Sequence, residues 1–180
     1  MNAPFHVPRR MNADEYLHWA LAQPAGRYEL LDGEVLTMPA ERAAHALLKL
    51  ELAIRLREAV RAAGLECQVF GDGMAVRVDD QTVFEPDALV RCGPALDPDA
   101  TVVIDPVIVA EVLSPSSRTA DTSVKLRRYF SIPTVSHYLI LNTDHAGAVH
   151  HHRTPGGIAT QIVPPGPLRL DPPGITLMLD

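Results

Sequence analysis

The sequence lacks the features that identify a membrane protein, a disulfide framework or a nucleotide-binding enzyme. No apolar run approaches the length of a bilayer span, and the first ten residues lack the apolar core of an export signal. Only two cysteines occur, with no CxxC pair, so we expect Cys67 and Cys92 to be ordinary thiols. Neither a GxGxxG nor a GxxxxGKS/T phosphate loop is present. These absences predict a cytoplasmic protein that does not enter membranes.

Aromatic residues and positive charge are also scarce. Phe, Trp and Tyr make up 5% of the chain, and the formal net charge is -6 at pH 7. Binding to phosphates through bulk electrostatics needs a basic surface, and stacking on unpaired bases needs aromatic side chains. The composition therefore argues against a protein that holds nucleic acid by its overall charge, although it leaves a local basic face open.

The chain does contain enough apolar material for a folded domain. Hydrophobic residues make up 47% of its 180 residues, which suits one domain with a sizeable core. No repeat of fixed period is present. We expect a flexible segment over residues 1–10 and a single domain over residues 11–180.

Local signals predict where the first elements begin and end. Asn12 and Glu15 have the spacing of a helix capping box, which predicts an N-terminal helix. Asp32-Gly33 lies between two short apolar runs and predicts a β-hairpin, because glycine tolerates the positive φ of tight turns. Residues 40–63 contain strong helix formers and neither glycine nor proline, and Gly64 follows as a natural C-terminal stop, so they predict a long helix.

Short segments rich in β-branched residues follow and predict strands, with a second helix over residues 119–130. A loop is expected over residues 92–106, and a proline-rich connection over residues 164–174. This order of elements predicts an α/β (α+β) fold in which helices flank a mixed central β-sheet. The expected strands span residues 65–70, 74–78, 82–90, 106–113, 137–141, 148–152, 158–163 and 175–179.

Two carboxylates stand out because they interrupt expected strands. Glu111 lies in the apolar run VIVAEVL, and Asp87 lies in VFEPDALV directly after a proline. Burying an unpaired carboxylate costs several kcal/mol, so a basic partner, a raised pKa or a metal ion should compensate. Two oxygens held close together by neighbouring strands suit Mg²⁺ or Mn²⁺. An exposed strand end is the alternative explanation for Glu111.

A lysine on the second predicted helix completes the pattern. Asp121 and Lys125 lie one helical turn apart in DTSVKLRRYF. A surface ion pair of these two residues is the simpler interpretation. If the helix instead packs over the strand ends, Lys125 extends an ammonium toward a metal site and can orient an attacking water.

Three consecutive histidines, His150 to His152, invite a second metal hypothesis. Successive strand residues point to alternate faces, so at most His150 and His152 can share one ion. A polar strand is the favoured interpretation.

One ordered set of motifs resembles the Uma family of restriction endonuclease-like proteins, a branch of the PD-(D/E)xK nuclease superfamily. The motifs are YELLDGEV, a helix that carries His45, EPDALV, and VAEVLSPSSRTADTSVKLRRYF. The resemblance covers roughly Tyr28 to Leu141. It is specific because EVLSPSS, DxxxKxxxY and the upstream Pro-Asp pair occur together and in order.

The resemblance implies a restriction endonuclease-like fold with a site for Mg²⁺ or Mn²⁺. It implies that Asp87 and Glu111 bind the metal and that Lys125 is the catalytic lysine. Leu113 stands where a strict ExK motif has its lysine, so Lys125 must act from the helix instead. The supporting residues expected beside the same pocket are Glu34, His45 and Asp121.

Two functions remain open on these residues. The first is a metal-dependent endonuclease that hydrolyses phosphodiester bonds in DNA, as a homodimer because two related sites cut two strands most simply. The second is a metal-stabilised binding or interaction module that keeps the fold and cuts nothing. Convergence of Asp87, Glu111 and Lys125 in a shared cleft with a basic rim favours the nuclease, whereas a buried Asp87 or an outward Lys125 favours the module.

Overall fold

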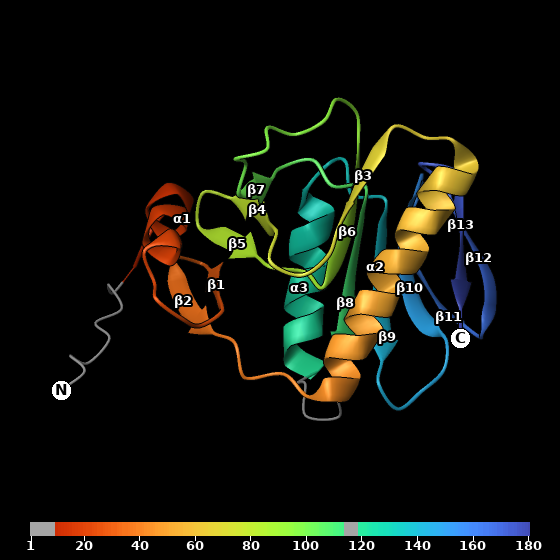
Figure 1. Ribbon diagram of the computed structural model, residues 1–180, viewed down its shortest axis with the longest axis horizontal. Helices are drawn as coiled ribbons and strands as arrows, with labels where there is room; N and C mark the ends of the chain where they lie inside the picture. Colours follow the sequence, from red (N-terminus) through yellow and green to blue (C-terminus); the bar gives the residue numbers. More distant parts are fainter. Residues whose placement is uncertain (1–9, 114–118) are drawn as a thin grey trace.

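The computed structural model describes residues 10–113 and 119–180, apart from the side chains of residues 119–121. The segment expected to be flexible, residues 1–10, therefore lies outside the described residues except for Arg10. None of the described helices is long and apolar enough to cross a membrane. The described residues form a mixed α+β architecture, as the sequence predicts, and their strands and helices make up three sheets and three helices rather than a single central sheet with its helices (Figure 1).

The larger sheet has six strands and is mixed, because one pair is parallel and the other pairs are antiparallel. Its central strand is buried along almost its whole length, which explains the continuous apolar run around Glu111. In spatial order the strands are β11 (Gly157–Val163), β10 (Ala148–Thr154), β9 (His137–Asn142), β8 (Ile108–Leu113), β6 (Ala88–Cys92) and β3 (Cys67–Phe70).

The second sheet has five shorter strands and carries the N-terminal helix α1 (Ala13–Leu21). Asn12 and Glu15 form the expected capping box of α1. The expected hairpin is also present, since Asp32 and Gly33 both have positive φ between paired strands. In spatial order the strands are β2 (Glu34–Thr37), β1 (Tyr28–Leu31), β5 (Thr82–Phe84), β4 (Ala75–Asp79) and β7 (Val102–Val103).

The two long helices cover opposite faces of the six-stranded sheet. On one face, Ala110 and Val112 pack in the same cluster as Leu52 of α2 (Ala43–Ala63). On the other, Val109 packs in the same cluster as Tyr129 of α3 (Thr119–Ser131). Alternate residues of β8 therefore face different helices, as the two-residue period of a strand requires. Figure 1 shows β8 and β6 between the two helices.

Gly64 ends α2 in the left-handed conformation, with φ 65, which confirms the predicted stop. The face of α2 that packs on the six-stranded sheet also packs against a C-terminal hairpin of β12 (Gly166–Leu170) and β13 (Ile175–Leu179). The sequence predicted only β13 there, because its proline-rich neighbour looked like a connection. Leu168 and Leu170 are buried in the core despite the flanking prolines, and this burial explains the extra strand.

Two other expectations need correction. Cys67 and Cys92 are not free thiols but form a disulfide between β3 and β6, whose register sets them directly opposite each other. The expected strand over residues 82–90 is split into β5 and β6, so Asp87 lies in a bend directly before β6 rather than inside a strand. Pro86 lacks the backbone donor that a continuous ladder needs.

Candidate functional site

The pairing of β6 with β8 brings Asp87 and Glu111 together. Ala88 lies opposite Ala110 in this antiparallel pair, and Asp87 and Glu111 are the residues next to them in the chain. The two carboxylates are close enough for the charge of Asp87 to raise the pKa of Glu111. The backbone N–H of Val112 donates to Asp87 Oδ2 at 2.7 Å and fixes that carboxylate. Asp87 is 5% exposed and Glu111 6%, so both carboxylates are buried.

Lys125 reaches this pair from α3. Its Nζ donates to Glu111 Oε1 at 3.0 Å and to Glu29 Oε1 at 2.9 Å, and it lies 5.3 Å from the centre of the Phe84 ring. Tyr129, one helical turn later, donates its hydroxyl to the same Glu111 oxygen at 2.9 Å. The ammonium therefore lies beside the carboxylate without a lysine at position 113.

The other side of the centre is formed by α2, from which His45 and Lys49 extend one turn apart. His45 Nε2 lies 2.6 Å from the carbonyl oxygen of Val112 and 3.7 Å from Asp87 Oδ2. Lys49 Nζ lies 3.5 Å from Asp87 Oδ1 and donates to Glu41 Oε1 at 2.5 Å. Asp87 thus contacts side chains of α2, whereas Glu111 contacts side chains of α3.

A wider ring of charged groups joins these two sides. Lys49 also donates to Asp72 Oδ2 at 2.7 Å, and the N–H of Glu85 donates to Glu29 Oε1 at 2.9 Å. Arg27 forms ion pairs with Glu41, Asp72 and Glu85. We call the whole set the acidic centre, because its carboxylates outnumber its lysines and arginine. The carboxylates are Glu29, Glu41, Asp72, Glu85, Asp87 and Glu111, and the cations are Arg27, Lys49 and Lys125.

Burial dominates the electrostatics of the acidic centre. Burial raises the pKa of Glu111 and of Asp87, and it outweighs the opposing effects of Lys125 on the first and of the Val112 N–H on the second. Burial also raises the pKa of Glu29. For Lys125 burial acts to lower the pKa, but Glu111 and Glu29 together hold it well above its usual value. Lys125 therefore keeps its charge. The raised pKa values of the three carboxyls show that the nearby cations do not offset the cost of burying them.

The ligands available in this centre fit a divalent cation. Glu41, His45 and Asp87 each offer a ligand atom, and these atoms lie within 4.8 Å of one another. With Nε2 of His45 beside a carbonyl oxygen, its Nδ1 is buried and has no hydrogen-bond partner among the described residues. Carboxylate oxygens with one imidazole nitrogen suit Mn²⁺, and the oxygens alone suit Mg²⁺. Asp87 is shared by this group and by the pair with Glu111.

Comparison with known proteins identifies the family. Residues 13–179 match the family described as "Uma2: Putative restriction endonuclease". This chain belongs to the Uma2 family. The match extends beyond the stretch that carried the motif resemblance, since it takes in α1 and the C-terminal hairpin.

Two further proteins resemble this Uma2 chain. The crystal structure of a "putative nuclease belonging to DUF820" from Anabaena variabilis ATCC 29413 has a TM-score of 0.71 and 15% identity, and the match covers 90% of each chain. At that identity the likeness is one of fold. The uncharacterized protein slr1290 of Synechocystis sp. (strain ATCC 27184 / PCC 6803 / Kazusa) is 26% identical over 157 residues, which cover 87% of this chain and 80% of that protein.

The supporting residues predicted from the sequence have different outcomes. His45 lies beside Asp87, as described above. Glu34 does not join the acidic centre: it lies next to the turn on the edge strand β2, its side chain is 63% exposed, and it pairs with Arg10 at 3.6 Å. Glu29, on the inner strand of the same hairpin, contacts Lys125 instead. The side chain of Asp121 lies outside the described residues.

Sequence reasoning missed Glu29 and Lys49, although each left a signal. Glu29 is a charged residue in the short apolar strand YELL, which is the same anomaly that drew attention to Glu111. Lys49 has helical spacing with Leu52, Leu56 and Val60, the buried stripe of α2. A lysine within such a stripe indicates a buried ammonium with acidic partners.

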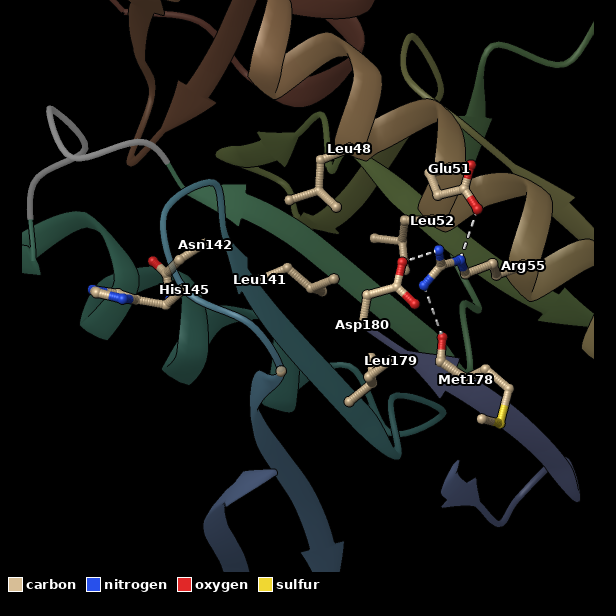
Figure 2. Close-up of a pocket in the computed structure, with 11 residues that line it drawn as sticks. Leu48, Glu51, Leu52, Arg55, Leu141, Asn142, His145, Met178, Leu179 and Asp180 are labelled. Carbon is tan, nitrogen blue, oxygen red and sulfur yellow. Dashed lines mark hydrogen bonds and ion pairs between the residues drawn. The ribbon is translucent and has the colours of Figure 1, made fainter. Parts of the chain in front are cut away.

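A small cavity elsewhere, of about 40 Å³, is structural in character (Figure 2). It lies where α2 meets β13 and the end of β9, and Leu52 and Leu179 are among the residues that line it. Arg55 bridges Glu51 and Asp180 there, and also donates to the carbonyl oxygen of Met178 at 3.3 Å. These contacts fix α2 against the C-terminal hairpin, and so support the helix that carries His45 and Lys49.

Proposed function

We propose that the protein is a divalent-metal-dependent endonuclease that hydrolyses phosphodiester bonds in DNA. The observation that carries the proposal is the convergence of Asp87, Glu111 and Lys125 Nζ from three separate elements. A chain that needed only a stable core would gain more from apolar residues at these positions, because burying charges is costly. Membership of the Uma2 family supports nuclease chemistry.

Asp87 and Glu111 would hold Mg²⁺ or Mn²⁺. A bound ion of this kind polarises a phosphoryl oxygen and lowers the pKa of a water molecule. Lys125 keeps its proton at Nζ and would stabilise the negative charge that develops on the attacking oxygen. Tyr129 holds Glu111 Oε1 through its hydroxyl, and Glu29 holds the ammonium in place. The chain thus supplies ligands, a fixed positive charge and the supports for both.

One observation favours the second candidate, a metal-stabilised binding or interaction module. Both Asp87 and Glu111 are almost fully buried. A phosphodiester can reach them only if the surrounding structure opens, whereas a small cation needs much less access. The inward position of Lys125 opposes this candidate, because a purely structural metal site has no need of a buried ammonium beside its ligands.

Cleavage of supercoiled plasmid at low salt, with Mg²⁺ or Mn²⁺, tests the nuclease. We expect metal-dependent nicking by the wild-type protein and at least about a hundredfold loss in Asp87→Asn and Lys125→Met, since each removes a direct contribution to the transition state. Arg127→Met, an exposed neighbour on the same helix as Lys125, is the matched control and should nick normally. Nicking at the wild-type rate by Asp87→Asn would contradict the proposed nuclease site. Metal binding without nicking supports the module.

We also propose one domain over residues 11–180 and a homodimer that works in the cytoplasm. Sedimentation with and without a DNA duplex tests the dimer, because two related sites should assemble on one duplex. The Cys67–Cys92 bond weighs against the cytoplasm, since disulfides persist mainly in oxidising compartments. Trapping of free thiols at lysis decides this point: alkylation of both cysteines supports the cytoplasmic location.

A further inference from the structure

Lys49 has surroundings that resemble those of a bound metal ion. It is 5% exposed, and its Nζ lies 2.5 Å from Glu41 Oε1, 2.7 Å from Asp72 Oδ2 and 3.5 Å from Asp87 Oδ1. Three carboxylates from three different segments thus converge on one nitrogen. A hard divalent cation is surrounded by carboxylate oxygens in the same manner, at somewhat shorter distances.

The position of Lys49 is fixed by the fold. Leu52 and Leu56, on the following turns of α2, are buried against the six-stranded sheet. Departure of the ammonium would leave these three carboxylates with less positive charge, since only Arg27 would then pair with Glu41 and Asp72. The fold therefore places the ammonium of Lys49 among the carboxylates on the α2 side of the acidic centre.

Asp87 stands between this ammonium and the rest of the site. Its Oδ1 faces Lys49, while its Oδ2 accepts from the Val112 N–H, on the strand of Glu111. A carboxylate shared by the two cations of a two-metal site uses its two oxygens in this way, so Lys49 would stand for one of those two cations.

We propose that Lys49 is a built-in cation that takes the place of a second metal ion, so that the centre takes up one divalent ion per chain. This inference rests on the proposed function, because it concerns the metal content of the same centre. Lys49 is a positioning residue: it acts through Asp87, Glu41 and Asp72, and holds their oxygens in the arrangement that a second ion would otherwise impose.

Titration with Mn²⁺ under metal-free starting conditions tests the proposal, with bound ions counted by electron paramagnetic resonance. We expect one Mn²⁺ per chain in the wild type and two in Lys49→Met, whose extra ion replaces the lost charge. Arg57→Met removes an exposed positive charge from the same helix and should still bind one ion. The double variant Glu41→Gln/Lys49→Met loses a ligand of the new site and should return to one ion.

A second measurement does not depend on catalysis. Mn²⁺ should raise the unfolding temperature of Lys49→Met more than that of the wild type, because its carboxylates have lost one positive charge and bind the ion at least about tenfold more tightly. If Lys49→Met folds only when Mn²⁺ is present, the proposal gains the same support. Failure of both Lys49→Met and Lys49→Gln to bind an additional ion would overturn it, as would two ions in the wild type.

The outcomes separate this proposal from the proposed function. One Mn²⁺ in the wild type and two in Lys49→Met, with no plasmid nicking by either protein, supports the role of Lys49 and removes the nuclease. Two ions in a wild-type protein that nicks plasmid supports the nuclease and removes the role of Lys49.

Discussion

Two polar clusters contact the same six-stranded sheet, and they differ in charge. The acidic centre at the ends of β6 and β8 has more carboxylates than cations. The histidine cluster consists of His137 on β9 and His150 on β10, and burial lowers the pKa of both, which favours their neutral forms. His137 Nδ1 lies 2.9 Å from His150 Nε2, and the side chain of Gln161 lies 3.1 Å from His150 Nδ1. Burial lowers the pKa of His150 to about 4, whereas it raises the pKa of Glu111.

The difference shows that burial of polar groups does not by itself indicate a functional site. Both ring nitrogens of His150 have a partner, and no group of three convergent ligand atoms among the described residues includes a histidine of this cluster, so the cluster is best explained as part of the core. The expected polar strand is in fact a buried one, since His150 is 2% exposed. The carboxylates need positive charge from outside their own cluster, and that need points to a metal ion.

The largest expected effect comes from removing Lys125. Lys125→Met leaves Glu111 and Glu29 uncompensated, and we expect a loss of about 3–5 kcal/mol in the free energy of unfolding at pH 7. Urea unfolding measures it. Because the pKa values of these carboxyls are raised, protonation at lower pH relieves the repulsion, so the loss should shrink from pH 7 to pH 5. Arg127→Met should be as stable as the wild type. A loss in Arg127→Met equal to that in Lys125→Met would show that the effect does not come from the buried ion pairs of Lys125.

Acid should affect the histidine cluster in the opposite direction. The pKa of His150 is lower in the folded state than its ordinary 6.5, so its contribution is complete above pH 6.5 and is lost as the pH falls toward 4. We expect the wild type to lose about 2 kcal/mol more than His150→Gln between pH 7 and pH 4.5. His145→Gln, at an exposed histidine, should titrate as wild type does. If the free energies of unfolding of the wild type and His150→Gln depend on pH in the same way, the protonation of His150 is not linked to folding.

The two glutamates of the N-terminal hairpin provide a matched pair. Glu29→Gln weakens the hold on Lys125, and we expect at least about a tenfold loss of metal-dependent nicking. Glu34→Gln changes an exposed residue that pairs with Arg10, so nicking should stay within about twofold of wild type. Nicking rates at saturating Mn²⁺ give the comparison. A larger loss of nicking in Glu34→Gln than in Glu29→Gln would show that Glu34, and not Glu29, contributes to catalysis.

The smallest effect is expected for the hydroxyl that supports Glu111. Tyr129→Phe removes one donor from a buried carboxylate and should cost about 1 kcal/mol of stability. Tyr28→Phe removes an exposed hydroxyl that donates to the carbonyl oxygen of Ala25, and should have little effect. Thermal unfolding of both variants measures the difference. Equal losses would show that Glu111 gains nothing from Tyr129.

The sequence by itself determined the elements whose signals are short in range. The capping box at Asn12, the two-residue turn at Asp32-Gly33 and the stop at Gly64 each depend on a few adjacent residues. The same holds for the anomaly at Glu111: a carboxylate in an apolar run is visible before any fold is known, and so is its need for a partner.

Only the tertiary structure decided which partners meet. Glu29 and Lys125 are 96 residues apart, and Lys49 and Asp72 come from separate elements. Their contacts depend on strand register and on which face each helix covers, and no local pattern specifies either. For the same reason the disulfide between Cys67 and Cys92 escaped prediction, since pairing across a sheet joins residues that are distant in the chain. The strand β12 pairs locally with β13 and escaped prediction because its prolines are typical of a connection, whereas its burial in the core is a tertiary effect.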